Sequence, residues 1–145
     1  MLPAQDNLKL TGKLKIFIND KLVKETDNLV TTVGKTWIAD RMQGGATTAM
    51  THMAIGTGST AVVVADTTLD TESFRQALTS SGGVASTNTV TFASTYAAGD
   101  GTGTITEAGV FEAASAGEML ARTVFTGVVK SAGDTMTISW VITVS

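Results

Sequence analysis

The sequence of 145 residues contains no cysteine, one histidine and few aromatic residues. Without cysteine there can be no disulfide framework, thiolate metal site or cysteine nucleophile. Any catalytic triad or multi-histidine metal site would have to use His52, and a lone imidazole at a strand edge is more often structural or solvated than catalytic. We therefore expect no enzyme, no cofactor and no metal site.

Long apolar runs and a strong net charge are also missing. No run approaches the roughly 18–20 apolar residues that cross a bilayer, and residues 1–6 lack the basic-then-apolar layout of a signal peptide. The net charge is −3, whereas a nucleic-acid-binding domain would be more basic and would carry interleaved aromatic residues for base stacking. We therefore expect that the protein binds neither membranes nor nucleic acid.

Basic residues nevertheless gather near the N-terminus. Residues 1–35 contain six lysines and four acidic residues, a net charge of +2, whereas four basic and nine acidic residues give the remainder −5. Such a segment can bind an acidic partner, although lysines on the solvated face of an edge hairpin are the commoner explanation. We divide the single domain into a basic leader and hairpin, residues 1–27, and a body, residues 28–145.

A period-two alternation dominates the C-terminus and predicts a half-buried strand. One face of this strand collects the apolar residues Met136, Ile138, Trp140, Ile142 and Val144. In all, strands are expected near residues 73–79, 86–95, 103–112, 118–128 and 134–144, the last being this C-terminal strand, after an N-terminal hairpin that turns at Asn19-Asp20. Turn signals recur every 10–18 residues or so, which favours an all-β antiparallel sandwich of jelly-roll-like form.

One short helix is expected near residues 31–43. Thr31 or Thr32 can cap its N-terminus, and Gly44-Gly45 ends it. The spacing of its apolar residues predicts that one face is buried, made up of Val33, Trp37, Ile38 and Met42.

Several segments resemble chemical motifs only in part. The glycine-rich residues 56–60 could cradle a phosphate, but they lack the spacing and the lysine of a phosphate loop, so a tight turn is favoured. Residues 99–103 offer too few oxygen ligands for calcium. Glu107, Glu112 and Glu118 lie on neighbouring predicted strands, and we interpret them as solvated carboxylates because nothing beside them supplies an apolar pocket.

Three segments together resemble a known class of protein: residues 28–42, residues 53–69, and residues 104–111 with the last two strands. Their order and content are similar to small structural proteins of tailed bacteriophages, in particular jelly-roll-like capsid cement or decoration proteins. The sequence departs from that pattern in having Ala61-Val62-Val63-Val64 where proline often follows the glycine-rich turn.

The resemblance implies a cement protein that bridges subunits of the major capsid protein and stabilises the assembled head by linkage. It would be made in the host cytoplasm, act as a homodimer or homotrimer, and lie on the capsid surface of the virion. Candidate contact residues form a basic group and an apolar group: Lys9, Lys13 and Lys15, and Val62, Val63 and Val64. A phage tail or fibre component is the closest alternative, and a carbohydrate-binding or hydrolytic module is a more distant one.

Overall fold

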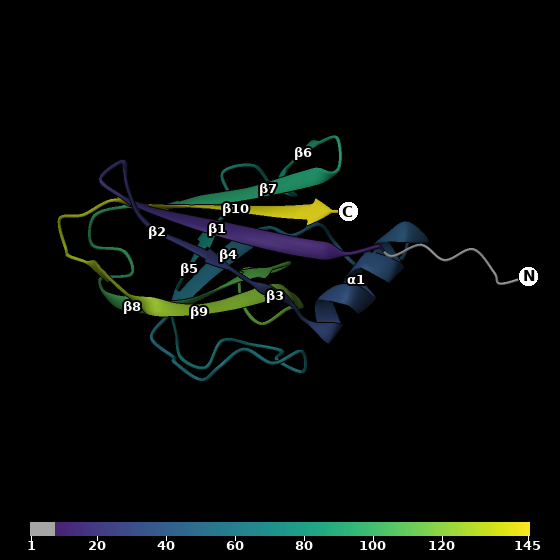
Figure 1. Ribbon diagram of the computed structural model, residues 1–145, viewed down its shortest axis with the longest axis horizontal. Helices are drawn as coiled ribbons and strands as arrows, with labels where there is room; N and C mark the ends of the chain where they lie inside the picture. The colour runs from purple at the N-terminus through teal and green to yellow at the C-terminus, as the bar shows by residue number, and fades with distance from the viewer. Residues whose placement is uncertain (1–7) are drawn as a thin grey trace, which may run out of the picture.

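A computed structural model describes residues 8–145 as two five-stranded antiparallel sheets packed face to face (Figure 1). In spatial order, sheet A consists of β2 (Lys21–Asp27), β1 (Leu10–Ile18), β10 (Met136–Val144), β7 (Thr89–Tyr96) and β6 (Val84–Ser86). Sheet B consists of β3 (Leu29–Val30), β9 (Met119–Lys130), β8 (Gly103–Phe111), β4 (His52–Gly56) and β5 (Glu72–Ala77). The predicted all-β sandwich is confirmed.

The strand predictions from residue 73 onward match this architecture, with one difference. The segment predicted as a single strand at residues 86–95 is the hairpin of β6 and β7, which pairs Ser86 with Thr89. Thr87 at the turn adopts a left-handed φ of 51°, a conformation that is typical of tight hairpin turns. The first hairpin turns at Asn19 and Asp20, both with positive φ, as the sequence predicts.

The core lies between the sheets and follows the alternation of β1 and β10. Their inward residues include Leu14, Ile16, Ile138 and Trp140, all fully buried. Leu14 pairs with Trp140 in the register of the two strands. The C-terminal strand therefore occupies the middle of sheet A and supplies the largest buried side chain.

The helix α1 (Thr32–Met42) closes one end of the sandwich next to β9 (Figure 1). Thr31 caps its N-terminus by accepting a 3.0 Å hydrogen bond from the N–H of Gly34. Gly34 is the buried residue of the helix, and a Cβ there would overlap the carbonyl of Leu120. The prediction that Met42 lies on the buried face is wrong: its side chain is 84% exposed because the last turn extends beyond the sandwich.

The outer faces of the two sheets differ. Sheet A presents its outer face to solvent, whereas residues 57–71, the connection between β4 and β5, lie across the outer face of sheet B (Figure 1). Leu69 from this connection forms a second buried cluster with Ala54, Phe111 and Met119. As a consequence, the central strands of sheet B are buried on both faces.

Both ends of the described chain leave the sandwich beside α1 (Figure 1). Lys9 and Ser145 exchange two backbone hydrogen bonds and extend the pairing of β1 with β10. Within residues 8–145, no helix has the length and apolar character needed to cross a membrane. Residues 1–7 of the predicted leader lie outside the described residues.

Candidate functional site

The outer face of sheet B contains a buried ion pair between Glu107 on β8 and Arg122 on β9. Glu107 Oε2 lies 2.8 Å from Nη2 and 3.2 Å from Nε of Arg122, so one carboxylate oxygen accepts two hydrogen bonds from the guanidinium. Both side chains are fully buried. A buried ion pair is stable only when its remaining donors and acceptors are also satisfied, so the surrounding partners decide what the pair does.

The partners of Glu107 are backbone amides of the connection that covers it. Its Oε1 accepts hydrogen bonds from the N–H groups of Gly58 and Thr71, and its Oε2 accepts one from the N–H of Asp70. The glycine-rich turn at residues 56–60 therefore does bind an anion, through the N–H of Gly58, but the anion is a carboxylate of the same chain. Glu107 ties both ends of the connection to sheet B.

Arg122 forms ion pairs with two aspartates of the same connection. Its Nη1 lies 2.9 Å from Asp66 Oδ2, and its Nη2 lies 3.4 Å from Asp70 Oδ2. Burial opposes the charged guanidinium, but hydrogen bonds to Glu107 and Asp66 outweigh it and raise the pKa of Arg122. Hydrogen bonds from Thr60 lower the pKa of Asp70. Arg122 and Asp70 therefore stay ionised at neutral pH.

Asp66 connects Arg122 to the exposed part of the connection. Its carboxylate accepts a hydrogen bond from the N–H of Val63, and its own N–H donates to the Val63 carbonyl. The Val64 carbonyl accepts a 2.8 Å hydrogen bond from the N–H of Thr32, at the start of α1. Val63 and Val64 are 53% and 47% exposed, and Val62 is half-buried. The connection therefore presents two apolar side chains on a fixed backbone.

The interpretation of Glu107 as a solvated carboxylate is wrong. Strand periodicity assigns Glu107 to the outer face of its sheet, and an outer face is usually wet. Here a remote segment covers that face, and no local pattern predicts such cover. The only signal in the sequence that Glu107 is buried was a basic residue on the next strand, Arg122. Its pairing with Glu107 depends on the strand register, which the sequence does not give.

The lysine candidates lie on the other side of the molecule. Lys13 and Lys15 are exposed on the outer face of sheet A, where Lys13 Nζ lies 3.4 Å from Glu25 Oε1. Lys9 is exposed just before β1. The structure therefore does not join the lysines and the valines into one surface.

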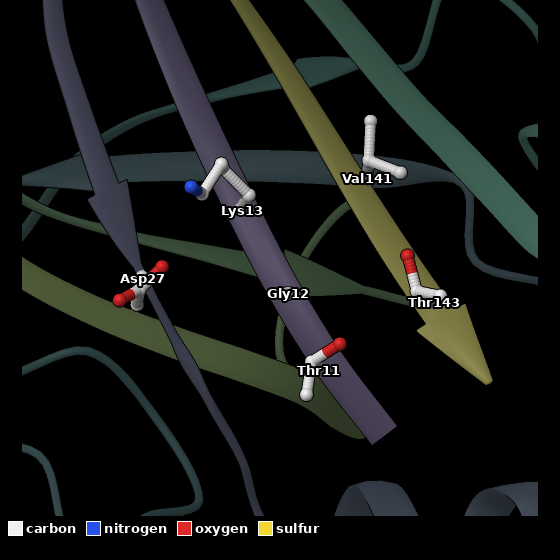
Figure 2. A pocket seen from close by; sticks show the side chains of 6 residues that line it. All are labelled: Thr11, Gly12, Lys13, Asp27, Val141 and Thr143. Carbon is white, nitrogen blue, oxygen red and sulfur yellow. The ribbon is translucent and has the colours of Figure 1, made fainter. Parts of the chain in front are cut away.

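A shallow hollow of about 240 Å³ lies beside Lys13 on the outer face of sheet A (Figure 2). It spans β1, β2 and β10, and is lined by Thr11, Gly12, Lys13, Asp27, Val141 and Thr143. Neither an aromatic ring nor a pair of facing carboxylates lines it. Its side chains can form hydrogen bonds and weak ionic contacts with a ligand.

His52 lies at the start of β4, where its Nδ1 is 2.8 Å from the Thr51 hydroxyl. Burial, with a further contribution from Arg75, lowers the pKa of His52. Arg75 itself stacks 3.8 Å above the ring of Phe111 and pairs with Glu72. Among the described residues, no group of three or more His, Cys, Asp or Glu side chains is arranged to hold a metal ion.

Residues 24–144 match the family model described as phage tail-collar fibre protein, N-terminal. The match covers all of sheet B, α1, the strands β6, β7 and β10 of sheet A, and both Glu107 and Arg122, but it leaves out β1 and the first part of β2. The chain belongs to the phage tail-collar fibre family. It is therefore a structural protein of a bacteriophage, and its place is in the virion. No curated protein and no solved structure matches the chain at a significant level.

Membership of the tail-collar fibre family contradicts one prediction and leaves two others without support. The predicted partner, the major capsid protein, is wrong, because the family consists of tail fibre components and not of head proteins. The capsid-surface location and the cement role find no support for the same reason.

Proposed function

We propose that this tail-collar fibre protein is a structural component of the phage tail fibre and acts by binding other virion proteins. The observation that carries the proposal is the family match over residues 24–144. It favours the fibre alternative among the functions that the sequence suggested. Within the fibre, this domain provides a rigid body to which further structural elements attach.

The contacts that hold the loops of this domain support a role in transmitting force within the fibre. Hydrogen bonds and ion pairs hold residues 57–71, its longest irregular connection, at several points along the connection. Backbone hydrogen bonds also pair Lys9 with Ser145, close to the two ends of the described part of the chain. A domain that keeps its loops and ends fixed transmits force without local unfolding, because local opening starts at segments with few buried contacts.

A binding role also accounts for the ionisable residues better than a catalytic one. The fully buried Glu107 and Arg122 already have protein partners on their donors and acceptors. A catalytic acid or base needs a site that a substrate can reach, and a continuous connection covers this pair. We therefore propose that the protein is not an enzyme.

Location in the particle tests the proposal. We would label the protein with specific antibodies in purified phage, image the particles by immunogold electron microscopy, and determine its copy number by quantitative mass spectrometry. A tail fibre component is expected to give label at the tail and few copies per particle. Label spread over the head, with a copy number that follows the major shell protein, would overturn the proposal.

A further inference from the structure

The outer edge of β9 has no partner strand over its second half. β9 pairs with β8 along its length, but its other neighbour, β3, pairs with only Ala121 and Arg122. In the part of the chain that the structure describes, no strand pairs with this side of residues 124–130, here called the open edge. An unpaired strand edge presents N–H and C=O groups with which another extended chain can pair.

Val124 and Val128 direct their backbone N–H and C=O groups toward this open side. The N–H of Thr31 donates to the carbonyl of Leu120, so Leu120 directs its groups toward β3, and every second residue as far as Val124 has the same orientation. Val128 shares it, because the partners of Val124 and Val128 on β8 lie two residues apart. No backbone hydrogen bond from another described segment reaches these groups.

The other outer edges of the two sheets are better protected against pairing. β2 contains four charged residues and a bulge, β5 contains two charged residues, and β6 has only three residues. Each of these features hinders association between strand edges. The open edge shares a bulge, at residues 125–127, but contains no proline. Its one charged side chain, Lys130, is buried and donates to the Ala97 carbonyl.

Strand β2 of sheet A borders the open edge. The Thr123 hydroxyl donates a 2.7 Å hydrogen bond to the Asp27 carbonyl, where β2 and β9 meet. From this contact the two strands extend toward the same end of the sandwich, at the left in Figure 1, and move apart. A strand added beside β9 would therefore lie next to the side chains of β2.

Two lysines of β2 are directed toward this space. In the register of β1 and β2, Lys24 pairs with Ile16 and Lys21 pairs with Ile18. Directly paired residues have their side chains on the same face of a sheet, and both isoleucines pack in the core. Both lysines therefore lie on the face of β2 that is directed toward sheet B. Among residues 8–145 neither lysine forms an ion pair.

The outer face of sheet B is apolar beside the same edge. Val124 pairs with Glu107, an outer-face residue, and Val128 belongs to the core, so Val124 and Val129 both lie on the outer face. Val129 is 63% exposed. An added strand would therefore have valines beside its outer side and lysines beside its inner side. An alternation of apolar and acidic residues complements this arrangement.

We propose that residues 124–130 bind an extended, acidic segment of a second virion protein, which adds a strand to sheet B. The unpaired main-chain groups identify the occupant as an extended polypeptide, the mode known as β-augmentation. The two lysines favour carboxylates in it. The inference rests on the proposed role in binding virion proteins and names a surface for it.

A peptide of about eight residues, within the usual length of a strand, with alternating glutamate and valine, is the probe. In an NMR titration of the isolated protein, binding is expected to shift the signals of residues 124–130. The Val124 and Val128 amides should exchange quickly with solvent in the free protein and slowly in the complex. The Val129 amide, directed toward β8, is the internal control and should be protected in both. N-methylation of alternate peptide amides, or lysine in place of glutamate, should weaken binding by at least about tenfold.

Protein variants test the charge complementarity. Lys24→Glu should weaken binding of the glutamate peptide by at least about fivefold. Lys13→Glu is the matched control, because Lys13 lies on the opposite face of sheet A beside Glu25, and it should leave binding nearly unchanged. Circular dichroism would verify that both variants fold. Equal effects of the two substitutions would overturn the proposal.

Four further results would also overturn it. Val124 and Val128 amides as protected as Val129 in the free protein would mean that the chain covers its own edge. Protection that grows with protein concentration would assign the edge to a second copy. Equal binding of the N-methylated peptide would reduce the contact to surface charge, and no binding of the glutamate peptide at about 1 mM would exclude the site. All of these measurements use the isolated protein, so such a failure would leave its location in the particle, tested by electron microscopy, unaffected.

Discussion

Glu107 Oε2 and Arg122 Nη2 lie 2.8 Å apart, and neither side chain is accessible to solvent. The pair joins two neighbouring strands, but most of its remaining hydrogen bonds go to residues 58–71. It therefore fixes a surface connection from inside the protein. An apolar pair at these positions would leave the amides of that connection without acceptors.

Replacing Glu107 by Gln should lower the free energy of unfolding by about 3–5 kcal/mol, because it removes the one fully buried counter-charge of Arg122 and the carboxylate that accepts three backbone hydrogen bonds. Urea denaturation measures this change. Lys13→Gln, which removes only the exposed pair with Glu25, is the control and should change stability by less than about 1 kcal/mol. Equal effects of the two substitutions would contradict the structural role of the buried pair.

Gly12→Ala should destabilise the fold by about 1–3 kcal/mol, an effect of overpacking. A Cβ at Gly12 would overlap the Asn28 side chain, whose Oδ1 accepts a 3.0 Å hydrogen bond from Trp140 Nε1. Thermal unfolding measures the change. Gly133→Ala is the matched control, since no heavy atom lies within 4 Å of the position that its new Cβ would take, and its effect should stay within about 0.5 kcal/mol.

Glu118→Gln should stabilise the protein at neutral pH and have little effect in acid. Burial raises the pKa of Glu118, with smaller contributions from Glu112 and Asp40. A raised carboxyl pKa means that the folded state favours the protonated form, so stability falls as pH rises above the ordinary value of 4.5. Melting temperatures of wild type and variant would be compared at about pH 4 and about pH 7. A gain that is the same at both pH values would refute this explanation.

The His52 imidazole should titrate below its ordinary pKa of 6.5. Burial is the main cause and Arg75 adds to it, so the folded state favours the neutral ring. Stability from this group is complete above pH 6.5 and is lost as pH falls below it. Because the chain has a single histidine, its ring protons can be followed by NMR without assignment. Arg75→Met should move the midpoint upward, and a midpoint above 6.5 in the wild type would contradict the prediction.

Local sequence patterns predicted most of the fold. The alternation in residues 136–144 reflects a strand with one face on the core and one in water, which is the situation of β10. Thr31 as N-cap and the glycines after Met42 similarly predicted α1, since capping depends on neighbouring residues alone. The same reasoning misplaced Met42, because exposure depends on how far the helix extends past the sheets.

The order of the residues alone was enough to establish a β-sandwich with one capped helix and an origin in a phage particle. The folded structure was needed to show that Glu107 is buried, that Arg122 neutralises it and that Val63 and Val64 are held rigidly at the surface. The features that the sequence could not predict all depend on contacts between residues that are far apart along the chain. Alternation shows which residues share a face of a strand. Whether that face is exposed to solvent depends on a segment remote in sequence, here residues 57–71, which cover β8. That contact forms only when the chain has folded and the intervening loop has closed.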